Sequence, residues 1–240
     1  MANPGRLPAG LSTRAKTDAC GMYGLPDPTA WHTYWNDFDS VACSPLTGSS
    51  AEWTITLVGS GTNVISAADG GVLLSTTSAG GSDQNSVQLV YATFLPTAGK
   101  KMIFKARWKV DALACGFQIG MVNTDTTQYA TSHPTDGIYF IKPASAGATL
   151  SVYCRKDATT GSTSKTGLGA VVAATYTETA FYYDGISEVS FYQDAVKIWS
   201  LTATSTYLPD ALLAPSYSIL NDTTAARAAS IDYILVANER

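Results

Sequence analysis

The residues best suited to acid–base or nucleophilic chemistry are sparse in this chain of 240 residues. A serine nucleophile needs a histidine beside it and an acid behind the histidine. His32 and His133 are the only histidines, and no Gly-x-Ser-x-Gly sequence offers a partner to either. We interpret His133, which precedes Pro134 in a polar stretch, as a loop residue, and His32 as a packed side chain. The chain also has no P-loop and no Gly-x-Gly-x-x-Gly sequence that opens a helix.

Metal ligands show no recognised spacing. The four cysteines form no Cys-x-x-Cys pair and are widely spaced, at Cys20, Cys43, Cys115 and Cys154. We expect buried or incidental free thiols, and no tetrahedral zinc site. Calcium prefers oxygen ligands, and Asn123, Asp125 and Asp136 lie in or beside one loop. Their spacing matches no known calcium loop, so an ordinary turn rich in Asn and Asp is favoured, and we predict no bound metal or cofactor.

The composition limits the class of protein. Only 14% of the residues are charged, whereas a typical soluble domain has about 25%. The net charge of −4 provides no basic field that would attract nucleic acid or anionic lipid. No run approaches the roughly 20 apolar residues of a membrane helix. The N-terminus lacks the apolar core of a signal peptide, so we expect synthesis in a cytoplasm without secretion.

Residues 101–110 (KMIFKARWKV) alternate with period two, which predicts a long strand with one face on a core. Met102, Phe104 and Trp108 are among its apolar residues. The opposite face is basic and carries Lys101, Lys105, Arg107 and Lys109. We interpret that face as a solvated strand surface, with contact to an acidic partner as the alternative.

Short strand-like runs separated by turn residues fill most of the remaining chain. They include residues 53–58, 64–65, 72–74, 87–91, 116–122, 137–142, 149–155, 176–183, 186–192, 196–201 and 229–237. Loops are expected at 76–85, 123–136 and 157–169. The runs 137–142 and 149–155 predict one hairpin, and the two runs around Gln193-Asp194-Ala195 predict another. No long helical pattern is present, so a sandwich or jelly roll is favoured.

Residues 1–30 differ from the rest, because prolines and glycines alternate there and apolar residues show no period. We predict an extended N-terminal arm at 1–30 and one folded domain at 31–240. The aromatic cluster that follows contains Trp31, His32, Tyr34, Trp35 and Phe38. It is interpreted as a staple between the arm and the domain edge, although exposed Trp and Tyr are also good anchors for proteins or sugars.

Two pieces of the chain resemble concanavalin A-like jelly rolls of the laminin-G and family 16 glucanase type. VSFYQDAVKIWSL resembles their Tyr-x-Asp-Gly hairpin, with Ala195 in place of the usual glycine, and SIDYILV resembles their closing strand. The chain also resembles structural proteins of tailed-bacteriophage virions in WNDFD, WTITLVGSG, AADGGVLL and AGKKMIFKARWKV. That second resemblance implies a jelly roll that decorates or stabilises the head.

The resemblance to family 16 implies glycoside hydrolysis, which requires two carboxylates that flank the scissile bond. In that family they stand as Glu-x-Asp-x-x-Glu, or a variant one residue longer, on one strand. This chain has glutamates only at Glu52, Glu178, Glu188 and Glu239. Glu188 and Asp194 have a predicted turn between them. We therefore predict that the chain is not an enzyme and has no catalytic residue.

These observations lead to an all-β, concanavalin A-like sandwich of two antiparallel sheets. The hypothesis is a non-enzymatic phage protein that binds the major capsid protein on the outer capsid surface. It would be made in the host cytoplasm, act in the virion as a homo-oligomer, and order its arm on binding. The alternative is a receptor- or glycan-binding, lectin-like module. Its stacking faces could come from Tyr182, Tyr183, Tyr192 and Trp199, although most of these are expected to pack in the core or at an edge.

Overall fold

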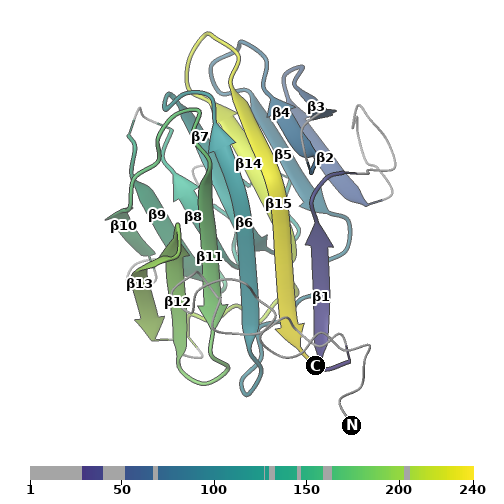
Figure 1. Ribbon diagram of the computed structural model, residues 1–240, viewed down its shortest axis with the longest axis vertical. Coiled ribbons are helices and arrows are strands. Elements are labelled where there is room, and N and C mark those ends of the chain that lie inside the picture. The colour runs from purple at the N-terminus through teal and green to yellow at the C-terminus, as the bar shows by residue number, and fades with distance from the viewer. Residues whose placement is uncertain are drawn as a thin grey trace.

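The chain folds in the computed structural model as a two-layer β-sandwich (Figure 1). The structure describes residues 29–39, 52–66, 70–126, 128–129, 133–144, 147–158, 164–202 and 206–240. Within these ranges every regular element is a strand, and there is no helix that could cross a membrane. The prediction of an all-β chain is confirmed. The predicted arm lies outside the described residues except for Thr29 and Ala30.

Sheet A is the eight-stranded layer, and its central strand is the long β15. Its strands lie in the order β13 (Val196–Thr202), β12 (Glu188–Gln193), β11 (Thr177–Tyr183), β6 (Met102–Val110), β15 (Ala228–Glu239), β4 (Val72–Thr76) and β3 (Thr62–Ser66). β1 (Trp31–Asn36) joins β4 on the same edge of β15, so the first and last described strands are neighbours. The Arg240 N–H donates to the Ala30 carbonyl at 2.9 Å.

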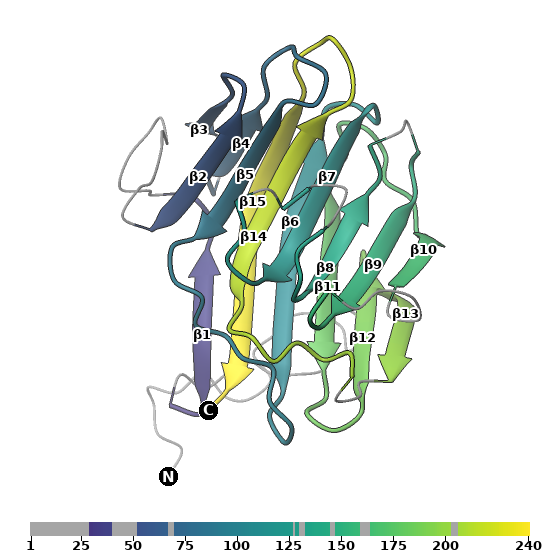
Figure 2. The same ribbon diagram turned by 180° about the vertical axis from the view of Figure 1, so that it is seen from behind.

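Sheet B is the seven-stranded layer, which faces the viewer in Figure 2. Its strands lie in the order β10 (Ser164–Leu168), β9 (Leu150–Arg155), β8 (Gly137–Lys142), β7 (Cys115–Val122), β14 (Ala214–Asn221), β5 (Gln84–Leu89) and β2 (Trp53–Val58). All neighbouring strands in both sheets are antiparallel, as predicted.

The core lies between the two sheets and follows from the alternation of the strands. In β6 the side chains of Met102, Phe104 and Trp108 are fully buried, which confirms the predicted inward face. Trp108 meets Phe117 of sheet B with ring centroids 4.4 Å apart. Such aromatic contacts stabilise the sandwich beyond simple area burial.

Three sequence expectations need correction. Residues 31–36 are not merely a staple, because they form the full strand β1, in which Tyr34 and Trp35 alternate between the two faces. β10 lies inside the expected loop 157–169, where a Ser/Thr/Gly-rich sequence pairs as an edge strand. β5 begins at Gln84 and ends at Leu89, so it starts earlier than the apolar run 87–91 suggests. Gln84 and Ser86 are polar on the outer face, and Asn85 between them is buried on the inner side, where its amide hydrogen bonds Asn63 of β3 at 3.0 Å.

The two predicted hairpins are confirmed as β8–β9 and β12–β13. The β12–β13 turn consists of Asp194 and Ala195, with φ angles of 47° and 69°. Two successive positive φ values are typical of a type I′ turn, which matches the twist of the strands that it joins. Ala195 therefore occupies a left-handed position that normally favours glycine.

Candidate functional site

The outer face of sheet B carries amides, hydroxyls and tyrosines beside a small apolar cluster that includes Val122 and Ile141. Alternation places the polar set opposite the core residues Val87, Ile119 and Phe140. Its members are Gln84, Ser86, Gln88, Gln118, Tyr139, Ser151, Tyr153, Arg155, Ser216 and Ser218. None of the seven strands of sheet B contains Asp or Glu. The face is therefore polar without an acidic group from its strands.

Hydrogen bonds join side chains across β5 and β14 on this face. Gln88 Nε2 donates to Ser216 Oγ at 2.8 Å, and the hydroxyls of Ser86 and Ser218 are 2.9 Å apart. All four side chains are at most 5% exposed. Buried polar groups of this kind are stable because each has a partner.

The loop that connects β7 to β8, residues 123–136, rests on the same face. Asn123 and Asp136 hydrogen bond at its base, where the Asn123 N–H donates to the Asp136 carbonyl at 3.0 Å. Gln88 donates to the Asn123 carbonyl at 3.0 Å and accepts from the Asp125 N–H at 3.1 Å. The ring of Tyr129 lies directly over Gly116, where a Cβ would overlap it. The Tyr129 hydroxyl donates to a carbonyl of β8 at 3.2 Å.

Several buried polar atoms between the loop and sheet B have no hydrogen-bond partner among the described residues. They are Gln118 Nε2 and Oε1, Gln128 Oε1 and His133 Nδ1, whereas the Tyr139 hydroxyl lies within hydrogen-bonding reach of Arg155. Gln118 is 1% exposed, and Gln128 and Tyr139 are 0% exposed. A buried polar group without a partner costs about 1–3 kcal/mol, so a cluster of them indicates a place for polar ligand atoms or water.

An aromatic group forms the edge of this cluster. Tyr139 and Tyr153 are stacked with centroids 5.4 Å apart and an interplanar angle of 8°. His133 lies 5.1 Å from the Tyr153 ring, and both of these side chains are half-buried. Burial and the nearby Arg155 lower the pKa of His133, which favours the neutral imidazole. His133 thus contacts tyrosine rings, and we find no serine beside it in the described contacts.

The three residues weighed as calcium ligands, for which the sequence favours an ordinary turn, are only partly brought together. Asn123 and Asp136 meet at the loop base, whereas the Asp125 backbone binds Gln88. Asp136 instead approaches Asp157 and Asp210, and their carboxylate oxygens lie within 4.8 Å of one another. These are the described residues that could hold a hard cation, although Lys156 already pairs with Asp210 at 2.6 Å. Sequence spacing could not reveal this group, because its members come from three separate segments.

The basic face of β6 is not simply solvated, and the favoured interpretation is wrong for Lys105. This residue is 6% exposed, and its ammonium lies 2.8 Å from the Glu178 carboxylate on β11. Arg107 pairs with Asp232 at 2.5 Å. The acidic partners therefore come from the neighbouring strands of the same chain.

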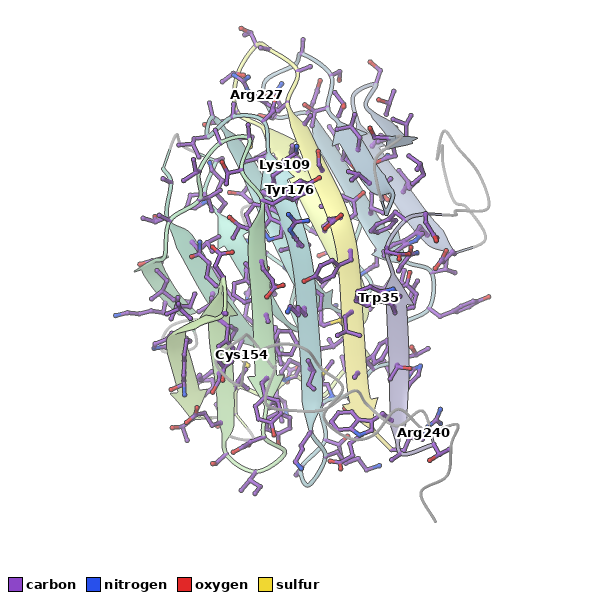
Figure 3. All side chains as sticks on the ribbon, in the orientation of Figure 1. Trp35, Lys109, Cys154, Tyr176, Arg227 and Arg240 are labelled. Atoms are coloured by element: carbon purple, nitrogen blue, oxygen red, sulfur yellow. The ribbon has the colours of Figure 1, made fainter. Side chains whose placement is uncertain are left out.

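Further along β6, Lys109 lies 4.6 Å from the centre of the Tyr176 ring. Figure 3 shows Lys109 and Tyr176 next to each other on sheet A, with Trp35 on β1. Trp35 is 55% exposed and stacks on Tyr233 at 5.2 Å. This part of sheet A exposes an aromatic surface beside paired charges.

Of the proposed stacking residues, Tyr183 and Trp199 pack with the core as expected, whereas Tyr182 and Tyr192 lie in a separate buried cluster on the outer face of sheet A. Tyr182, Tyr183 and Tyr192 are at most 8% exposed, and Trp199 stacks on Phe191 at 5.6 Å. The sequence did not single out Gln118 or Tyr139, which now define the candidate site. Gln118 is one polar residue within the apolar run GFQIGMV, which is the signal that could have found it.

His32 and the two described cysteines are packed among other side chains. His32 is confirmed as a packed histidine, because it stacks on Phe94 at 4.3 Å with an interplanar angle of 5°. Cys115 and Cys154 are buried free thiols, as predicted, whereas Cys20 and Cys43 lie outside the described residues. Burial raises the pKa of Cys115 to about 11, which makes a reactive thiolate rare at neutral pH.

The chain matches no protein-family model and no curated protein. Solved structures resemble it in fold at low sequence identity. An endo-1,3-beta-glucanase from Streptomyces sioyaensis has a TM-score of 0.63 and 15% identity, covering 90% of this chain and 99% of the glucanase. The Emp47p carbohydrate recognition domain has a TM-score of 0.59 and 10% identity, covering 90% and 100%. Peanut lectin has a TM-score of 0.56 and 10% identity, covering 87% and 97%.

These similarities show the fold, which is the concanavalin A-like jelly-roll sandwich that the short motifs resemble. The same fold serves lectins and glucanases, so it does not determine whether this chain is an enzyme.

Proposed function

We propose that this chain is a non-catalytic, lectin-like module that binds a glycan on the outer face of sheet B. The observation that carries the proposal is the set of unpartnered polar atoms on Gln118, Gln128 and His133. Glycan hydroxyls both donate and accept hydrogen bonds, and an amide side chain can satisfy both roles. The half-buried Tyr153 and His133 provide aromatic surface at the edge where a sugar would enter.

The non-catalytic part of the proposal rests on the strand composition. Hydrolysis by the two-carboxylate mechanism needs an acid and a second carboxylate on opposite sides of the bond. The described strands of sheet B provide neither. Glu188 and Asp194 belong to the β12–β13 hairpin of sheet A, and Glu188 is paired with Lys197 at 2.5 Å.

The test compares two glutamines on the same face. A glycan array would first identify a ligand, and calorimetry would then measure its affinity for the wild type and for Gln118→Met. We expect binding to weaken about ten-fold or more, since each lost hydrogen bond is worth roughly 1–1.5 kcal/mol. The melting temperature should stay the same or rise, because the change removes an unpartnered buried amide.

The matched control is Gln88→Met. Gln88 has partners at Ser216, Asn123 and Asp125, so this change should lower the melting temperature. A glycan that binds Gln118→Met as tightly as the wild type would refute the site. The absence of any bound glycan in the array would refute the function.

The second candidate is the capsid-decoration role that the phage resemblance implies. The observation in its favour is the presence of large exposed apolar side chains, such as Tyr91 at 72%, Ile186 at 82% and Val196 at 65% exposure. In this role the chain would bind the major capsid protein in the virion, with several copies on each shell.

The test of this role adds the protein to shells assembled without it and then pellets the shells. Saturable co-sedimentation with a higher shell melting temperature is expected, and no binding would refute this role.

A further inference from the structure

A second apolar cluster lies on the outer face of sheet A, away from the core. We call it the sheet A patch, and its members are Ile103, Ala180, Tyr182, Tyr192 and Ala237. Their strand neighbours Phe104, Phe181 and Val236 point into the core, so alternation directs the patch outward. Every member is nevertheless at most 8% exposed.

Only part of the outer face of sheet A is buried in this way. Further along the same face, the Arg107 side chain is 43% exposed and Trp35 is 55% exposed. The outer face of sheet B is buried where the 123–136 loop rests on it, so burial of an outer face indicates a covering segment. Among the described residues, only Trp31 is a partly buried apolar side chain that packs on the patch. A cover over β15, β6, β11 and β12 must come from residues outside the described ranges.

We propose that residues 1–28 of the same chain dock across the sheet A patch. The described chain begins at Thr29, and Trp31 borders the patch, so this segment starts beside it. At about 3.3 Å per residue it could extend roughly 90 Å. The four strands that carry the patch span only about 15 Å, since neighbouring strands are about 4.8 Å apart.

Other undescribed segments fit poorly. Residues 203–205 are too few to cross four strands, because they could extend only about 10 Å. Residues 40–51 follow β1 at its far end and lead into β2 of sheet B. The remaining short gaps fall in turns or loops of other strands, such as 159–163 between β9 and β10.

The composition of the segment suits this position. Its apolar side chains can cover aromatic and aliphatic groups, and they include Leu7, Leu11, Met22, Tyr23 and Leu25. Its four prolines have no N–H to leave unpaired on a sheet face, and they restrict the free segment, which lowers the entropy cost of docking. In this proposal the segment covers its own domain instead of being held free for another protein.

The test measures thiol labelling at Ser190, which is 5% exposed and pairs with Tyr182 on the same face. Ser190→Cys is made together with Cys20→Ser and Cys43→Ser, in the full chain and in a chain lacking residues 1–28. We expect deletion to speed labelling about ten-fold or more, because it removes the cover. Circular dichroism verifies that the shortened chain is folded, and adding a peptide of residues 1–28 should restore protection.

The matched control is Thr33→Cys, an exposed position that pairs with Ala237 on the same face. Its labelling should be fast with and without the segment. Equal labelling of the two positions in the full chain would overturn the proposal. Protection of Ser190→Cys that persists after deletion would also overturn it. If that protection is lost on dilution, the cover is a second copy of the chain.

Discussion

On the outer face of sheet A, charged side chains pair with one another, whereas on the outer face of sheet B, uncharged polar side chains meet and some have no described partner. Lys105 and Glu178 form an ion pair in sheet A. Gln118 in sheet B is just as buried, yet neither end of its amide is bonded. Strand alternation places side chains on both faces in the same way. The two faces therefore differ in whether their buried polar groups have partners. Removing one member of a buried pair is costly, and a buried group without a partner marks a place that a ligand could complete.

The largest effect is expected from breaking the buried pair on sheet A. Glu178→Leu leaves the Lys105 ammonium buried, because its side chain is only 7% exposed. Removal of one member of a buried pair typically costs about 3–5 kcal/mol of unfolding free energy. Urea denaturation would measure the loss. The double variant Lys105→Met/Glu178→Leu should recover most of it, since it leaves no unpaired charge.

Glu188→Leu is the control for that change. Its partner is Lys197, and the two side chains are 43% and 44% exposed. Solvent screens such a pair, so the expected loss is below about 1 kcal/mol. Equal losses for Glu178→Leu and Glu188→Leu would show that burial does not distinguish these pairs.

An intermediate effect is expected where the 123–136 loop meets sheet B. Gly116→Ala places a methyl group in the space of the Tyr129 ring, so the loop must move. Overpacking of this kind typically costs about 1–3 kcal/mol. Calorimetry would measure the lower melting temperature, and hydrogen exchange should increase at the Asp125 amide, which donates to Gln88.

The control is Gly81→Ala, which has room for its methyl group and should change neither measurement. Unchanged exchange at Asp125 in Gly116→Ala would contradict the docked loop.

A smaller effect concerns the two histidines, His32, which stacks on the core residue Phe94, and His133, which lies beside the Tyr153 ring of sheet B. Burial lowers the pKa of His32 and of His133 below 6.5, with added effects of Arg240 and Arg155 respectively. The unfolded chain therefore binds more protons than the folded chain near and below that pH. Stability should fall as the pH is lowered through about 6.5, and level off below the folded pKa values. Urea denaturation between about pH 7.5 and about pH 5 measures the slope. His32→Gln and His133→Gln should each flatten it, and an unchanged slope in both would contradict this origin.

The smallest effect should come from the β12–β13 turn, which strengthens sheet A without altering its charges. Ala195→Gly relieves a left-handed conformation with a φ of 69°. We expect a gain of roughly 0.5–1 kcal/mol, after the greater flexibility of the unfolded glycine chain is included. Thermal denaturation would show a small rise in melting temperature. A decrease would argue against the type I′ turn.

The strands with strong patterns were predictable from sequence, and the contacts across strands were not. The alternation of residues 101–110 predicted β6, and the sequence SIDYILV predicted part of β15. The burial of Lys105 depends on Glu178 from β11, and no local pattern relates these two strands. Basic residues on a strand resemble a solvated face until the partner strand is known.

The candidate site was missed for a similar reason. Gln118 and Tyr139 lie on neighbouring strands, but an isolated glutamine and an isolated tyrosine carry no spacing signal. β10 was missed because its Ser/Thr/Gly-rich sequence has weak strand propensity, and pairing with β9 decides its structure. Tertiary contacts, rather than local preference, determined each of these features.

The pairing of β1 with the end of β15 has a mechanical consequence. Trp31 stands opposite Glu239, and the Ala30 carbonyl accepts from the Arg240 N–H, so the two strand ends emerge side by side. A pulling force applied at residues 29 and 240 would load the hydrogen bonds of this antiparallel pair one after another, because these bonds run perpendicular to the strands. The pair would then unzip at low force, whereas a pull along opposite ends of the sandwich would load many bonds at once. A tether at these two points would therefore yield by peeling β1 away before the sandwich itself opens.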